Sequence, residues 1–215
     1  MNIDPRKASD VRRHDMFNIV ALSVLSALDI KYLYEATDFT LIGSDKIGSQ
    51  ADFHPLFVVF ITYMIVDSLW VLVVPTCTMA TQTQILFHHL MTALCLLTPL
   101  YAPQFYWHVA LGVTAEVNTL FLTIRRNATK DTYIFTLSNI CFYITWICVR
   151  LVLFPMLCVF FYYEYLRYSR VVTSYVNVVG VAVVSQVVLT SLGYYWTLEM
   201  IGKMMGGNKG GNKTQ

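Results

Sequence analysis

Six ionisable side chains interrupt the long apolar stretches of this sequence and are its first candidates for chemistry. They are Asp67, His88, His89, His108, Glu116 and Arg150. An ionisable side chain in an apolar environment is costly unless it is paired or functional. A carboxylate and an imidazole can stabilise each other, and a histidine held in this way can act as a general base. We therefore predict a polar, catalytic site formed by Asp67, Glu116, His88 and His89.

The positions of these residues place them at similar depths in their apolar stretches. Asp67, His88 and Glu116 each lie within about nine residues of the same predicted end of their helix, or about 14 Å at 1.5 Å per residue. Three helices would thus bring two carboxylates and a histidine pair into one half of a helix bundle. Two interpretations fit these residues equally: an active site, and a structural clasp between helices.

The two histidines are adjacent, which restricts what they can do together. Neighbouring residues point about 100° apart around a helix. We therefore expect either His88 or His89 to face a cavity and the other to reach backbone or lipid headgroups. A metal site would favour a pair spaced as H-x-x-x-H on one helix face, so we expect neither a metal nor a bound cofactor.

The remaining polar residues of the apolar stretches are expected to be structural. Asn118 is a candidate for hydrogen bonds between helices. Arg150 is expected in the outer half of its helix, where it can pair with Asp29 or extend toward the surface. His108 follows two aromatic residues and is expected at the membrane interface.

Composition shows what surrounds these residues. Of the 215 residues, 56% are hydrophobic and only 13% are charged, with a mean hydropathy of +0.55. Soluble domains carry about 25% charged residues, and the apolar blocks here suit helices that cross a layer about 30 Å thick. The sequence predicts an all-α, polytopic transmembrane helix bundle. Its net charge of +2 and its lack of a basic patch among aromatics argue against binding to nucleic acid.

Six spans are predicted, with five and seven as alternatives. They cover residues 16–34, 55–76, 84–99, 104–124, 132–162 and 171–200. Residues 1–15 form a cytosolic or matrix-side segment, and residues 201–215 a flexible polar tail. Pro155 is expected to kink or end the fifth span.

Basic residues predict the orientation, because they are enriched on the cytosolic side of membrane proteins. With six spans, ten basic residues share one side: Arg6, Lys7, Arg12, Arg13, Arg125, Arg126, Lys130, Lys203, Lys209 and Lys213. Only Lys46, Arg167 and Arg170 fall on the other side. Both termini are therefore expected to face the cytosol or its equivalent, with the loop at 35–54 on the opposite side.

Three stretches resemble the TLC-domain membrane proteins, the family named for its TRAM, Lag and CLN members. They are Asp67-Ser68-Leu69-Trp70, His88-His89-Leu90-Met91-Thr92, and Glu116-Val117-Asn118-Thr119-Leu120-Phe121-Leu122 followed by Arg125. The family includes ceramide synthases, in which the histidine pair is followed by His-Asp-x-x-Asp. This chain has Ala115-Glu116-Val117-Asn118-Thr119 at that point. It therefore resembles the branch that does not synthesise ceramide, and the departure argues against N-acyl transfer from CoA.

The resemblance implies a lipid-binding or lipid-modifying protein of membrane lipid or sphingolipid homeostasis. A cytosol-facing cavity would admit an acyl chain, and acyl-CoA is a candidate substrate of an acyltransferase-like reaction. Either histidine would act as general base, oriented by Asp67 or Glu116. Further pocket or structural residues are Thr92, Asn118, Thr119, Arg125 and Arg150. The resemblance favours the endoplasmic reticulum, with the mitochondrial inner membrane as the alternative. The other class of function is a noncatalytic accessory subunit that binds other membrane subunits in a larger complex.

Overall fold

The computed structural model describes residues 5–37, 53–74 and 77–207, whose regular structure is helical. The helices are α1 (Pro5–Thr37), α2 (His54–Val73), α3 (Met79–Tyr101), α4 (Trp107–Asn127), α5 (Tyr133–Thr145), α6 (Phe154–Val171) and α7 (Val178–Gly207). A short 3-10 helix η1 (Pro103–Phe105) precedes α4, and a π-helix η2 (Trp146–Leu153) joins α5 to α6. The prediction of an all-α fold is confirmed.

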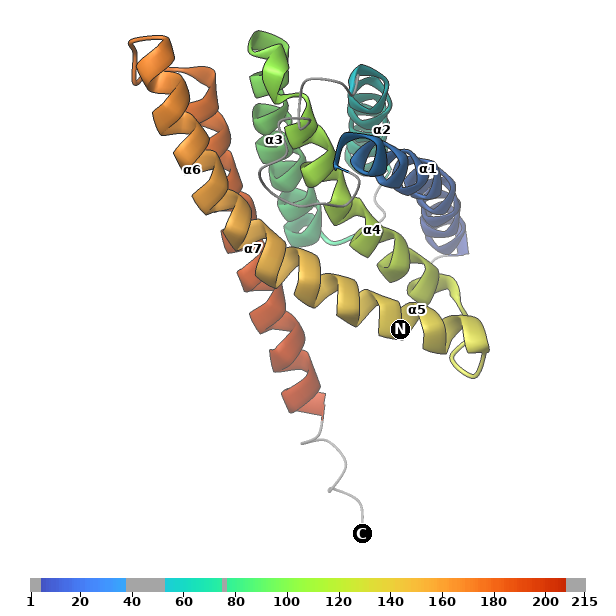
Figure 1. Cartoon of the computed structure of the whole chain (residues 1–215). Helices are drawn as coiled ribbons and strands as arrows, with labels where there is room; N and C mark the ends of the chain where they lie inside the picture. The colour runs from blue at the N-terminus through green and yellow to red at the C-terminus, as the bar shows by residue number, and fades with distance from the viewer. Residues whose placement is uncertain (1–4, 38–52, 75–76, 208–215) are drawn as a thin grey trace.

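Among the described residues, five helical segments are long and apolar enough to cross a membrane. They are Ser9–Tyr34, His54–Val73, Met79–Tyr101, the continuous α5–η2–α6 segment Tyr133–Val171, and Val178–Met205. Helix α4 is more polar and packs against α1, α2, α3 and α5 (Figure 1). A helix that faces other helices can carry polar groups that would be costly against lipid. The chain is therefore a multi-pass membrane bundle in which α4, the long helix outside these five segments, packs among the others.

Successive passes alternate in direction, so that α1 begins and α7 ends at the same end of the bundle (Figure 1). We call this the first end. There Trp196 Nε1 on α7 donates a hydrogen bond of 3.0 Å to Gln84 Oε1 at the start of α3. At the opposite end, Thr98 Oγ1 on α3 donates to the Val178 carbonyl at the start of α7, at 3.3 Å. With α5–η2–α6 as one segment, the described residues form six long helical segments, five of which are apolar enough to cross a membrane.

Several predicted boundaries are wrong because polar residues extend the helices. Helix α1 begins at Pro5, well before residue 16, and a proline is readily accommodated in the first turn of a helix. The fifth pass continues to Val171 instead of 162, and α7 spans Val178–Gly207. Residues 201–207, which were predicted to belong to the flexible tail, are thus helical. Within this stretch, Lys203 contacts Glu199 at 2.8 Å. The rest of the tail lies outside the described residues.

The predicted kink of the fifth pass is present, one turn earlier than Pro155. Helices α5 and α6 run in different directions (Figure 1), and the π-helix η2 lies between them. Pro155 is in the first turn of α6, where its ring removes one backbone donor from the ladder. The wider turns of η2 accommodate the change of direction and determine where Arg150 points.

The orientation of the bundle in its membrane can be tested with glycosylation. The native sequons Asn127-Ala128-Thr129 and Asn212-Lys213-Thr214 fall on the predicted cytosolic side, so we expect neither to be modified. Ile42→Asn creates a sequon ending at Ser44 in the opposite loop, and we expect this variant to be glycosylated on translation into microsomes. A glycosidase-sensitive gel shift reports the result. A shift of the wild-type chain without a further shift of the variant would contradict the orientation.

Candidate functional site

Asp67 on α2 joins three helices at the first end of the bundle. Its Oδ1 accepts a hydrogen bond of 2.7 Å from His14 Nε2 on α1, and its Oδ2 lies 3.5 Å from His89 Nε2 on α3. Ser68 Oγ is 2.8 Å from His89 Nδ1. When His89 carries its proton on Nε2, this nitrogen can donate toward the Asp67 carboxylate. Nδ1 can then accept a hydrogen bond from the Ser68 hydroxyl. We call Asp67, His14, His89 and Ser68 the Asp67 cluster.

Two members of the cluster are buried, and His89 and Ser68 are half-buried. Asp67 is 4% exposed and His14 7% exposed, and the His14 ring packs 5.4 Å from the Trp70 ring. A buried carboxylate is tolerated when charged or hydrogen-bonding partners surround it. The expectation that one histidine reaches backbone or headgroups is therefore wrong for His89, which is held by α2 side chains.

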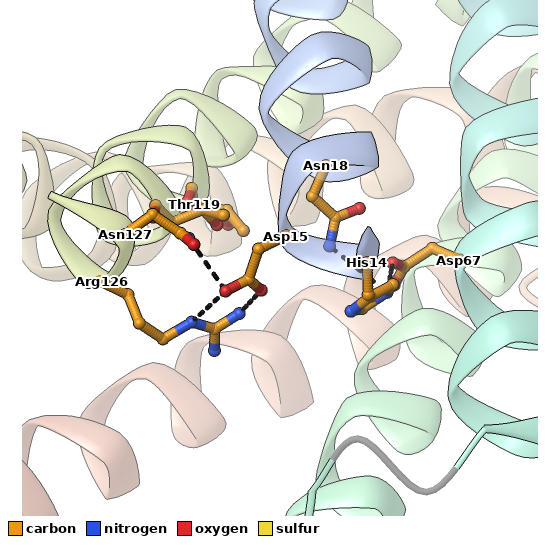
Figure 2. Close-up of polar contacts among 8 residues, drawn as sticks. His14, Asp15, Asn18, Asp67, Thr119, Arg126 and Asn127 are labelled. Carbon is orange, nitrogen blue, oxygen red and sulfur yellow. Dashed lines mark hydrogen bonds and ion pairs between the residues drawn. The ribbon is translucent and has the colours of Figure 1, made fainter. Parts of the chain in front are cut away.

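On the neighbouring face of α1, Asp15 forms a second contact between helices. Figure 2 shows Asp15 turned toward α4 while His14 turns toward Asp67 on α2. Asp15 accepts from both Arg126 Nε, at 3.0 Å, and Arg126 Nη2, and also from Asn127 Nδ2 at 2.9 Å. Such a fork of two parallel bonds is the strong geometry for an arginine and a carboxylate. The pair fixes the start of α1 to the end of α4.

We expect Asp15→Ala to lower the free energy of unfolding by about 1–3 kcal/mol, because it removes a buried acceptor from two neighbours. The matched control is Asp10→Ala on the same helix. Asp10 meets Arg13 at 4.0 Å with both side chains exposed, so its loss should cost about 0–1 kcal/mol. Thermal unfolding in detergent measures both variants. Equal melting temperatures for the two would show that the Asp15 contact does not stabilise the fold.

A narrow cavity of about 40 Å³ lies among α2, α3, α4, α6 and α7. His88, Thr92 and Glu116 line its polar end. The rest of its wall is mainly apolar and includes Phe60, Leu96, Val109, Phe154, Phe161 and Leu189. Such a space has one end suited to polar or reactive groups and a long apolar wall.

His88 is the histidine of the pair that faces this cavity. Its Nδ1 is buried without a hydrogen-bond partner, and its ring meets the Trp196 ring edge-on at 5.8 Å between centroids. Glu116 is 7% exposed and accepts a hydrogen bond from the Thr119 side chain. An unpaired imidazole that lines the same cavity as a carboxylate could accept a proton from a hydroxyl or an amine.

The structure therefore divides the four predicted catalytic residues into two groups. Asp67 and His89 belong to the Asp67 cluster, whereas His88 and Glu116 line the cavity. The groups are neighbours, since Glu116 also interacts electrostatically with Asp67. The two interpretations drawn from the sequence, a clasp and a site, thus apply to different members of the set.

The expectation for Arg150 is wrong. Asp29 instead accepts a hydrogen bond of 3.1 Å from Thr114 on α4, and Arg150 is 4% exposed inside the bundle. Its guanidinium lies among aromatic rings and interacts electrostatically with Glu116. Depth along the sequence could not reveal this placement, because the π-helix changes the direction in which Arg150 points.

His108 also differs from its expectation as an interfacial residue. It is 7% exposed, and neither of its ring nitrogens has a hydrogen-bond partner. Its ring stacks on Phe161 at 4.4 Å between centroids and lines the end of the cavity away from His88. The neighbouring aromatics in the sequence surround a buried ring and do not mark the membrane surface.

The other predicted polar residues mostly join helices or helical turns. Asn118 Nδ2 donates to the Phe142 carbonyl and to Thr145 Oγ1, each at 3.0 Å, which agrees with the predicted hydrogen bond between helices. Thr92 Oγ1 donates to the His88 carbonyl at 3.0 Å. The Arg125 guanidinium lies 4.7 Å from the centre of the Phe142 ring. These contacts support the walls of the site.

A second hollow opens on the outer surface between α2 and α3, with a volume of about 330 Å³. Its wall is apolar except at Ser68 and His89. Because both helices are apolar enough to cross a membrane, the groove is exposed to lipid chains. The Asp67 cluster therefore lies between this surface groove and the interior of the bundle.

Sequence reasoning missed His14 and Asp15, because the first span was assigned to begin at residue 16. Hydropathy marks only the apolar part of a helix, and both residues precede it. The available signal was an adjacent histidine and aspartate directly before an apolar run. Such a pair can continue the helix and face polar groups on two different neighbours.

Comparison with protein families gives one match. The model described as TLC domain matches residues 16–202, a range that includes the His88 cavity and most of the Asp67 cluster. Comparisons with curated proteins and with solved structures give no match.

Proposed function

Since the chain belongs to the TLC-domain family of membrane proteins, we propose that it binds or modifies lipids in the cavity between its helices. One observation carries the proposal: the buried, unpartnered His88 Nδ1 in the wall of a mainly apolar cavity. An acyl chain suits the apolar wall, and a lipid hydroxyl, amine or carbonyl suits the polar end. His88 would act as general base, with Glu116 stabilising the imidazolium that forms.

The size of the cavity adds a condition to this proposal. Ligand pockets usually have volumes of about 300–1,000 Å³, whereas this cavity has about 40 Å³. An acyl chain would therefore enter only as side chains along the wall change rotamer. Phe60, Phe154 and Phe161 line the cavity and are the large side chains whose movement would widen it.

Gly112 offers a direct test, because it lines the cavity and a Cβ atom added there would have no neighbour within 4 Å. We expect Gly112→Leu to fill the space without disturbing the helix, which should gain up to about 1 kcal/mol from the loss of glycine. The variant should lose most of the lipid that copurifies with the wild-type chain. Mass spectrometry of lipid extracts from purified protein measures the loss.

Gly202→Leu is the matched control, since a Cβ atom at this glycine also has no neighbour within 4 Å and Gly202 is exposed on α7. It should retain wild-type lipid. Equal lipid content in both variants would contradict a ligand in the cavity. Equal lipid content together with loss of partner proteins from both variants would favour the noncatalytic accessory subunit.

We further propose the endoplasmic reticulum as the site of this lipid role, with the mitochondrial inner membrane as the alternative. Fractionation of cells expressing the full chain distinguishes the two. Lipids that carry an acyl chain and acyl-CoA are the candidate ligands, since the apolar wall would hold the acyl chain.

A further inference from the structure

Arg150 is a buried cation whose donors lack partners. It is 4% exposed, and its Nε and Nη1 atoms have no hydrogen-bond partner. Leaving a buried charged group without hydrogen bonds is expensive, and most buried polar groups in folded proteins are paired. A structural role alone does not account for an arginine left in this state.

The surroundings of Arg150 supply aromatic faces but few acceptors. The guanidinium carbon lies 5.9 Å from the Trp146 ring centre, 5.4 Å from Phe154 and 5.7 Å from Trp196. Aromatic faces attract a cation, yet they do not accept directed N–H bonds as an oxygen does. Glu116 interacts with Arg150 electrostatically, but the two side chains form no ion pair within 4.0 Å among the described residues. The free N–H groups therefore suit oxygen atoms of a ligand.

Arg150 and His88 lie against the same tryptophan, and His88 lines the cavity. The Trp196 ring is 5.8 Å from the His88 ring and 5.7 Å from the Arg150 guanidinium. Phe154, which packs on Arg150, lines the cavity together with His88. His88 Nδ1 is also unpartnered and His88 interacts electrostatically with Arg150, so unpaired groups from two segments lie near each other beside Trp196.

Depth in the membrane indicates which oxygen-bearing group fits. His88 lies nine residues after Met79, the first residue of α3, which corresponds to about 14 Å and thus to the middle of a layer about 30 Å thick. Phosphate headgroups remain at the membrane surface, whereas the carboxyl group of a single fatty acyl chain could reach this depth if it were paired. Arginine binds carboxylates through two parallel hydrogen bonds.

The π-helix and a glycine prepare this position. Segments of π-helix are frequent at functional sites, and η2 presents Arg150 toward α7 instead of toward lipid. On α7, Gly193 has no side chain at this approach, and a Cβ atom there would lie 3.9 Å from the Arg150 carbonyl oxygen and 4.0 Å from its Cδ atom. The two helices thus enclose the guanidinium.

We propose that Arg150 and His88 form a carboxylate-binding subsite that holds the carboxyl end of a free fatty acid, with its chain along the apolar wall of the cavity. This inference rests on the lipid role proposed above and names the ligand class. The negative charge of the free acid is the feature that Arg150 recognises. Glu116 competes for the same cation, so Glu116→Gln should strengthen binding of the acid.

The test uses the full chain in detergent and the fluorescent fatty acid cis-parinaric acid. We expect the free acid to bind at least tenfold more tightly than its methyl ester, which has the same chain without the charge. Arg150→Met should remove this preference, so that the acid and the ester bind with equal affinity. The matched control is Arg167→Met on α6, whose side chain is 81% exposed and whose loss should preserve the preference.

The wild-type comparison needs no variant, so it remains decisive even where Arg150→Met fails to fold. Equal affinity for the acid and the ester would overturn the carboxylate subsite while leaving lipid binding intact. A phospholipid with a parinaroyl chain that binds as tightly as the free acid would also overturn it. Binding of none of the three probes would overturn both this inference and the proposed lipid role.

Discussion

His88→Ala is expected to abolish lipid turnover while preserving the fold. The loss of a general base lowers a rate by about 10² to 10⁴-fold. Because His88 Nδ1 has no hydrogen-bond partner, removing the ring leaves no neighbour of that atom unpaired. Cells that lack the protein can be complemented with the variant, and their acyl-chain profiles compared with the melting temperature of the purified chain.

The neighbouring histidine provides the matched control for this prediction. His89 contacts Ser68 and Asp67, so His89→Ala should lower the melting temperature more than His88→Ala does. The two variants remove the same side chain from adjacent positions of one helix. A loss of about 1–3 kcal/mol for His88→Ala, with an unchanged lipid profile, would show that His88 is structural.

Asp67→Ala is expected to cause the largest loss of stability. Removing one partner of a buried ion pair costs about 3–5 kcal/mol, because the remaining polar groups stay buried without compensation. Here His14 and His89 on two other helices would both lose their acceptor. Thermal and denaturant-induced unfolding in a mild detergent measures this change.

An exposed ion pair gives the control for Asp67. Glu199 and Lys203 approach to 2.8 Å with side chains that are 43% and 75% exposed, so Glu199→Ala should cost only about 0–1 kcal/mol. Asp67→Asn retains the shape of the side chain and one acceptor oxygen. Its loss of stability should lie between those of Asp67→Ala and Glu199→Ala. If Asp67→Ala were no more destabilising than Glu199→Ala, the Asp67 cluster would not stabilise the packing of α1, α2 and α3.

The fold class was predictable because hydropathy reports directly on the membrane. Long apolar blocks with few charges leave a helix as the one way to satisfy the backbone. The ends of helices were less predictable, since polar residues there are stabilised by contacts between helices. Asp15 extends α1 only because Arg126, far away in sequence, faces it.

The similar depth of the predicted site residues followed from the sequence, but their division between the Asp67 cluster and the cavity did not. Depth along a helix follows from residue number, and it placed Asp67, His88 and Glu116 in the same half of the bundle. Direction around the helix depends on how each helix is rotated against its neighbours, which a single sequence does not reveal. His89 therefore turned out to face Asp67, while His88 faces the cavity.

Arg150 illustrates a further limit. A regular α-helix would have been assumed for residues 146–153, whereas the chain forms a π-helix there, which changes the direction of every following side chain. A pairing of Arg150 with Asp29 was expected from charge and depth alone. The actual partner of Asp29 is the hydroxyl of Thr114.

The central claim is that the His88 cavity holds a lipid, and the acyl-chain composition of membrane lipids tests it most directly. Cells that lack the protein should be complemented with wild-type chain, Gly112→Leu, His88→Ala or the control Gly202→Leu, at equal protein levels. We expect the wild type and Gly202→Leu to restore the profile, and the two cavity variants to fail although they remain folded. Restoration by all four chains, or lost assembly with other membrane proteins and unchanged lipids, would contradict the claim.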